Sequence, residues 1–153
     1  MTSILTGDII NSRTVATNEW LPLLKTTFNT VGITPKIWEI YRGDSFQIEI
    51  EKVENALLFA IKLKATLKKI KNLDVRIAIG IGSKNNDYKN ITEGSGEVFI
   101  NSGNAFDTML KKQNLALISP WKDMNKILNT SLALASLTMD SWTVNSAGFV
   151  IKS

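Results

Sequence analysis

The sequence predicts an α+β fold whose core follows the order strand, helix, strand, strand, helix, strand. Three observations indicate this order. Residues 2–10 and 74–82 are apolar runs typical of buried strands. Residues 36–51 alternate apolar and polar side chains on both sides of a tight turn, as a β-hairpin does. The segments 18–31 and 53–71, which lie between these strands, have the composition of helices. This is the ferredoxin-like split βαβ arrangement.

The first helix has clear start and stop signals. Thr17 or Asn18 can cap a helix over 18–31. Pro22 falls in its first turn, where a missing N–H group costs little, and Gly32 stops it.

The second half of the chain appends a helix, a strand and a helix to this core. A polar loop over 83–96 comes first. We then expect a helix around 99–111, a strand at 115–118, and a long helix from Pro120 to about Met139. The sequence has no internal repeat, low-complexity segment or linker, so we expect a single domain over residues 1–153.

Composition limits the chemistry open to this chain. Its 153 residues are 44% hydrophobic and 21% charged, as in ordinary globular proteins. The absence of cysteine and histidine excludes disulfides, thiolate metal sites, Ser-His-Asp triads and His-ligated zinc. A bound metal must therefore be a hard cation held by oxygen, such as magnesium, manganese or calcium.

Much of the net charge of +4 comes from one run of lysines, Lys62, Lys64, Lys68, Lys69 and Lys71. We interpret the run as the solvated face of a helix. The alternative is that it attracts a nucleotide or nucleic acid at long range. The N-terminus lacks the layout of a signal peptide and no apolar run could cross a bilayer, so we expect a cytoplasmic protein without a membrane partner.

Two aspartates stand at strand ends in this order. Asp8 closes the first strand, and Asp44 occupies the hairpin turn. The first and third strands pair in the middle of a split βαβ sheet, which brings these two residues together. Close carboxylates repel each other unless a divalent ion bridges them, and magnesium takes one or two carboxylates plus phosphate oxygens. The spacing predicts a site for a nucleoside triphosphate and its metal; the competing interpretation is that Asp is simply a common turn residue.

Residues beside the aspartates suit phosphate groups. Arg13 and Arg42 flank the pair and can reach phosphate oxygens. The turn after the first strand is expected to leave backbone N–H groups free to bind an anion, from Ile9, Ile10, Asn11 and Ser12.

At these residues the sequence resembles the class III nucleotidyl cyclases. Residues 6–12 (TGDIINS) and 41–46 (YRGDSF) are similar to their two metal-binding segments. Residues 76–82 (RIAIGIG) are similar to the strand that follows, and 96–101 (GEVFIN) to the segment that carries their transition-state Asn. The resemblance covers nearly the whole chain. It is closer to the SatD-like family of bacterial proteins described as transcriptional regulators.

This resemblance implies a nucleotidyl cyclase-like palm domain that binds a nucleoside triphosphate. Asp8, Ile9 and Asp44 would hold Mg²⁺ or Mn²⁺, and Asn101 would be catalytic. Class III cyclases form their sites between two chains, so the resemblance also implies a homodimer.

Two positions depart from the cyclase pattern. The arginine that cyclases place four residues after the Asn is Ala105 here, and the base-selecting residue before the hairpin Asp is Ile40. Losing a transition-state cation can cost several kcal/mol, so we expect weak or absent cyclase activity. The alternatives are a catalytically inactive regulatory or dimerisation module of a transcriptional regulator, or a nucleic-acid-binding protein. Residues 139–147 resemble the lead-in to a helix-turn-helix, but too few residues follow for a DNA-reading helix pair.

Overall fold

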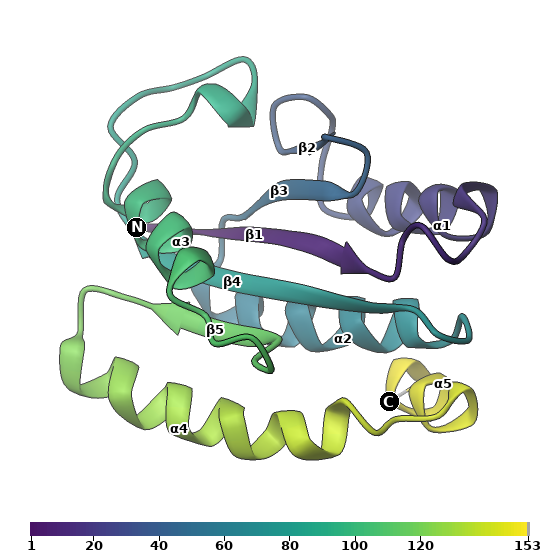
Figure 1. Ribbon diagram of the computed structural model, residues 1–153. Coiled ribbons are helices and arrows are strands. Elements are labelled where there is room, and N and C mark those ends of the chain that lie inside the picture. Colours follow the sequence, from purple (N-terminus) through teal and green to yellow (C-terminus); the bar gives the residue numbers. More distant parts are fainter. Residues whose placement is uncertain (153) are drawn as a thin grey trace.

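The computed structural model of the chain describes residues 1–152 and confirms the α+β class (Figure 1). Short 3₁₀ turns at Val53–Asn55 and Ile91–Glu93 precede α2 and α3. The strands are β1 (Thr2–Ile10), β2 (Trp38–Tyr41), β3 (Ser45–Ile50), β4 (Asp74–Gly82) and β5 (Leu115–Ile118). The helices are α1 (Thr17–Asn29), α2 (Ala56–Lys68), α3 (Glu97–Asp107), α4 (Lys122–Met139) and α5 (Val144–Lys152).

The five strands form one sheet in the order β2-β3-β1-β4-β5. β1 lies in its centre and pairs antiparallel with β3 on one side and β4 on the other. β5 continues the sheet parallel to β4. Successive residues of a strand point to opposite faces, so the register of β1 decides which of its side chains lie inside.

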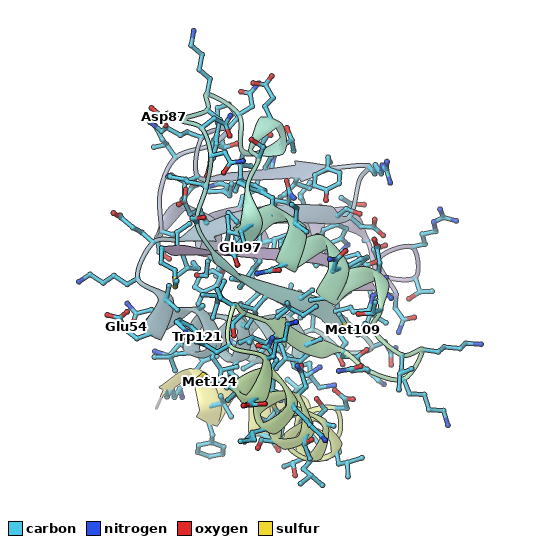
Figure 2. The ribbon with its side chains drawn as sticks, turned by 90° about the vertical axis from the view of Figure 1, so that its left-hand side faces the viewer. Glu54, Asp87, Glu97, Met109, Trp121 and Met124 are labelled. Carbon is cyan, nitrogen blue, oxygen red and sulfur yellow. The ribbon has the colours of Figure 1, made fainter. Side chains whose placement is uncertain are left out.

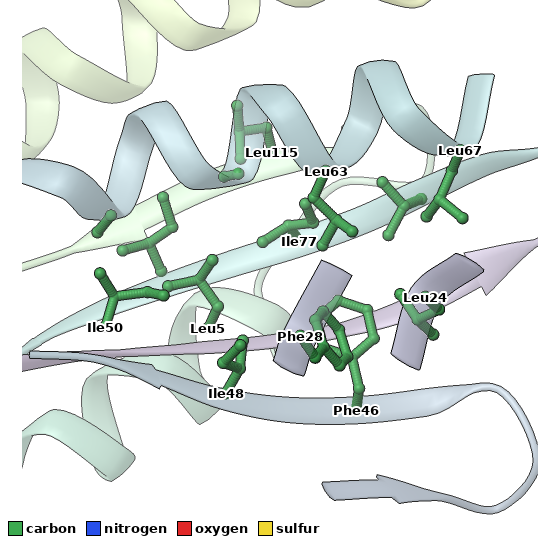
Figure 3. Packing of buried hydrophobic residues seen from close by; sticks show 14 of the residues in the cluster. Leu5, Leu24, Phe28, Phe46, Ile48, Ile50, Leu63, Leu67, Ile77 and Leu115 are labelled. Atoms are coloured by element: carbon green, nitrogen blue, oxygen red, sulfur yellow. The ribbon is translucent and has the colours of Figure 1, made fainter. Parts of the chain in front are cut away.

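One face of the sheet carries the main hydrophobic core. Leu5 of β1 packs there with Phe28 of α1 and Leu63 of α2, together with Phe46 and Ile77 from the neighbouring strands (Figure 3). These side chains are all at most 1% exposed, which is the burial that makes the hydrophobic effect the main stabilising force.

The opposite face is covered in part by α3 (Figures 1 and 2). Ala78 packs there against Ala105, and a side chain at Gly80 would collide with the backbone of Val98 and Ser102. The alternation of small and large residues in β4 therefore reflects close packing under a helix rather than a ligand surface. The rest of this face carries polar residues of β2 and β3, of which Glu49 is buried and the others are half-buried.

Most predicted bounds differ from the observed ones by only a few residues, but one helix was missed. β4 and β5 have the predicted bounds, and α4 ends at Met139 as expected. α3 starts two residues early, directly after Gly96, whose φ of 120° suits glycine. The helix α5 was not predicted; it packs against α2. None of the helices within residues 1–152 combines the length and the hydropathy that spanning a bilayer requires.

The interpretation of the lysine run as a solvated face is wrong at two positions. Lys64 is only 2% exposed and forms ion pairs of 2.8 Å with both Asp74 and Asp140. Lys68 lies beside it, 3.3 Å from Asp74. A buried ammonium needs such partners, because removing a lone charge from water costs several kcal/mol. These two lysines therefore join α2 to β4 and to the residue that follows α4.

A second buried polar cluster fixes the loop between β4 and α3. The Glu49 carboxylate, 5% exposed, accepts hydrogen bonds from Tyr88 (2.6 Å), Thr2 (2.8 Å) and Lys84 (3.2 Å). Burial by itself raises the pKa of Glu49, but these three hydrogen bonds and the Lys84 charge outweigh it and lower the pKa below its ordinary value. Glu49 is therefore the anchor of this loop on the sheet.

The packing of α3 on Gly80 predicts a sharp contrast between two glycines. Gly80→Ala should lower the free energy of unfolding by about 1–3 kcal/mol, because the methyl group has no room. Gly103→Ala, on α3 where an added methyl group meets no atom within 4 Å, should raise it by about 0.5–1 kcal/mol. Urea unfolding measures both. Equal stabilities would show that α3 does not press on β4 here.

The Glu49 cluster predicts an acid-sensitive contribution to stability. Because the folded-state pKa is lowered, the ionised carboxylate stabilises the fold fully above its ordinary pKa of 4.5, and this stabilisation disappears as the pH falls through the folded-state pKa. Glu49→Gln should lower the free energy of unfolding by about 1–3 kcal/mol near pH 7. It should also flatten the pH dependence of this free energy between about pH 5 and 3. Glu54→Gln, at an exposed position, is the matched control. Parallel pH profiles of Glu49→Gln and the wild type would contradict this.

Candidate functional site

The structure brings the two predicted aspartates to the same end of the sheet. Asp8 lies in β1 opposite Ser45, the first residue of β3, and Asp44 immediately precedes Ser45. The Ile9 N–H group donates to the Asp44 carbonyl at 3.1 Å, which continues the ladder into the turn. The Ser12 hydroxyl donates to the Asp44 carboxylate at 2.6 Å. Residues 36 positions apart in sequence are thus held side by side by β-pairing.

Asp8 already has a cationic partner that the sequence analysis did not identify. Arg76 stands opposite it on β4, and the guanidinium donates to the carboxylate at 3.1 and 3.4 Å. The same guanidinium lies 4.2 Å from the centre of the Phe106 ring, a cation–π distance. Only the register of β1 against β4 reveals this pair, since directly opposite residues share a face.

A tyrosine on β2 lies within electrostatic reach of the same carboxylate. Tyr41 pairs with Ser45, so it shares the face of Asp8. Burial raises the pKa of Tyr41; the Arg42 charge opposes this shift and the Asp8 carboxylate adds to it. The phenol therefore stays protonated at neutral pH and remains a hydrogen-bond donor.

A hollow of about 500 Å³ opens beside Asp8, and its charged lining is mainly cationic. Arg76 forms part of it, and Lys111 and Lys112 enter from the turn between α3 and β5. Both lysines are exposed. No motif in the sequence marks these two lysines, because they lie in a turn.

The remaining phosphate-binding candidates are only partly available. The expectation of a free N–H group at Ile9 is wrong, because Asp44 accepts it. Asn11 has a φ of 65° and its carboxamide donates to the Asn72 carbonyl at 2.9 Å. Arg13 and Arg42 are exposed near the two aspartates, where they can meet an anion. Ile10 lines the hollow.

Asn101 lies far from the aspartates within one chain. Its side-chain amide donates to the Ile81 carbonyl at 2.8 Å. Ile81 pairs with Ser3, roughly 17 Å along the strand from Asp8 at about 3.4 Å per residue. Ala105, on the next turn of α3, is 1% exposed and faces the sheet. Both side chains are thus directed at the sheet, and an arginine at position 105 would have no access to a ligand.

The donor set suits a divalent ion that brings its own phosphate ligands. Within residues 1–152, no group of three or more His, Cys, Asp or Glu side chains gathers to hold a metal. Two carboxylates at one sheet end are nevertheless what magnesium commonly takes from a protein when phosphate oxygens complete its shell. Arg76 competes for one of them, which weakens any site for the bare ion.

Comparisons with known proteins add little to this geometry. No family model matches the chain, and no curated protein does. Among solved structures, it is similar to the active GGEEF domain of a diguanylate cyclase from Vibrio cholerae. The two share 19% sequence identity over 77% of this chain and 81% of that chain, with a TM-score of 0.49. This is a weak match.

Proposed function

We propose that this chain binds a nucleoside triphosphate together with Mg²⁺ or Mn²⁺ at the sheet end that carries Asp8 and Asp44. The single observation behind the proposal is the pairing of β1 with β3, which holds both aspartates at one end of the sheet. The cationic hollow beside Asp8 supports a polyphosphate ligand. The strand order fits a ferredoxin-like palm domain of the nucleotidyl cyclase type.

In this proposal the chain contributes two kinds of contact. Asp8 and Asp44 hold the metal with their carboxylates, and the Ile9 carbonyl oxygen is a further ligand. Arg13 and Arg42 bind phosphate oxygens from the turns. The metal neutralises phosphate charge when bound. Because Asp8 is shared with Arg76, the proposal requires cooperative binding, in which metal and triphosphate bind much more tightly together than the metal does alone.

We further propose that cyclisation is weak or absent. Ala105 is buried at the position where cyclases place their arginine. Asn101 is engaged with the backbone of β4 and could reach a bound nucleotide only from a second copy of the chain. This favours a ligand-binding regulatory module that acts as a homodimer, as the resemblance to class III cyclases implies.

The metal site is tested by calorimetric titration of ATP and GTP with and without Mn²⁺. Asp8→Ala and Asp44→Ala should each lose at least tenfold in affinity in the presence of Mn²⁺, about 1.4 kcal/mol, because a carboxylate ligand is gone. Asp123→Ala, which removes an exposed carboxylate at the start of α4, should bind like the wild type. The proposal is wrong if Mn²⁺ raises the nucleotide affinity of both site variants as much as it raises that of the wild type.

The proposal that cyclisation is weak or absent is tested separately. Labelled ATP and GTP incubated with the protein and Mn²⁺ should remain almost entirely unconverted, since the cation of the cyclase pattern is missing. Thin-layer chromatography separates triphosphate from cyclic and linear products. Rapid, metal-dependent conversion that disappears in Asp44→Ala would show that the chain is an enzyme after all.

A further inference from the structure

We propose that the hollow lined by Arg76, Lys111 and Lys112 is a phosphate subsite that operates without a metal, and that the groove beyond it receives the nucleoside of the same ligand. This inference deepens the proposed nucleotide site and takes the class of ligand from it. It assigns a direction to the ligand, with the phosphates beside Asp8 and the base towards Trp142.

Arg76 is held ready to bind an oxyanion. The Asp8 carboxylate fixes it from one side at 3.1 Å, and the Phe106 ring supports it from another at 4.2 Å. A guanidinium carries more N–H groups than the two that Asp8 accepts. The remaining donors keep their geometry without further loss of side-chain entropy, which favours a planar, bidentate contact with a phosphate.

The charge of the hollow is unbalanced. Three cations line it, Arg76, Lys111 and Lys112, against one carboxylate, that of Asp8. Since Asp8 and Arg76 neutralise each other, the two lysines are left in excess. Both ammonium groups are exposed, and neither forms an ion pair in the described part of the chain. A phosphate monoester carries about −1.5 to −2 at neutral pH, which matches this excess.

A second open space lies next to the hollow. This groove of about 660 Å³ is lined in part by Ile10 and Asn114, which also line the hollow. Its volume lies in the range of small-molecule sites. The groove is also lined by Asn72 in the turn before β4, by Trp142 between α4 and α5, and by Asn145 in the first turn of α5.

The lining of this groove suits a nucleobase and its sugar. Trp142 is half-buried at the edge of the main core and offers an aromatic surface for stacking. Carboxamides supply both donors and acceptors, which the edges of all bases and the ribose hydroxyls can use. Four of them face the groove, from Asn11, Asn72, Asn114 and Asn145. The charged residues of the groove are Lys68, Lys71 and Asp74. Lys68 and Asp74 neutralise each other at 3.3 Å, so the groove keeps one excess positive charge, that of Lys71, against the two of the hollow.

The test measures, by calorimetry, the binding of AMP, GMP and pyrophosphate to the protein in the presence of EDTA. The wild type should bind both nucleotides without metal, and Lys111→Gln/Lys112→Gln should weaken all three ligands at least tenfold. Lys122→Gln/Lys126→Gln, an equal loss of charge on the exposed side of α4, should change little. Asn145→Ala should weaken AMP and GMP but leave pyrophosphate unchanged, because Asn145 lines the groove and does not line the hollow.

The outcomes separate this inference from the metal site. Failure of the wild type to bind any of the three ligands in EDTA, or equal binding by the two lysine double variants, would overturn the phosphate subsite even if Asp8→Ala abolishes the effect of Mn²⁺. Loss of binding in Lys111→Gln/Lys112→Gln, with no effect of Mn²⁺ in any variant, would support the subsite and remove the metal proposal. A single-stranded 12-mer that binds far more tightly than AMP, with a steep salt dependence, would replace the nucleotide groove by a nucleic-acid surface.

Discussion

The pairing of β1 with both of its neighbours is the constraint on which the rest of the molecule depends. A shift of one residue would turn Leu5 from the main core to the face of α3 and carry Asp8 into the apolar interior. The same register sets Asp8 between Ser45 and Arg76 and so creates its electrostatic surroundings. Core packing and the chemistry of the sheet end are thus specified by one set of backbone hydrogen bonds.

In the proposed site, the Asp8–Arg76 pair would allow one end of the sheet to bind both a cation and an anion. An isolated pair of carboxylates would favour any divalent ion, whereas a guanidinium beside one of them lowers that affinity. Phosphate oxygens bring back the negative charge that Arg76 removes, and they also give the guanidinium a second partner. The proposed site would therefore bind the complex of metal and nucleotide more tightly than either component alone.

Local patterns in the sequence were sufficient for most elements but not for long-range partners. The apolar run of β4 and the hairpin around Asp44 could be predicted because their signals lie within a few residues. The burial of Lys64 could not, since Asp140 lies 76 positions away and nothing in the lysine run distinguishes one ammonium from the next. Arg76 was missed for a related reason: its role follows from cross-strand register rather than from composition. The helix α5 was missed because its short segment contains Gly148 and several residues with low helix propensity.

The ion pairs of Lys64 with Asp74 and Asp140 limit how the chain can be shortened. Asp74 comes from the sheet, but Asp140 comes from the residue after α4, beyond every strand. A fragment that stops after β5 would retain all five strands and both site aspartates, yet it would leave an interior ammonium with half of its counter-charge and uncover the side of α2 on which α5 packs. The last two helices are thus structural members of the fold, and a shortened chain that is to carry the proposed site has to include them.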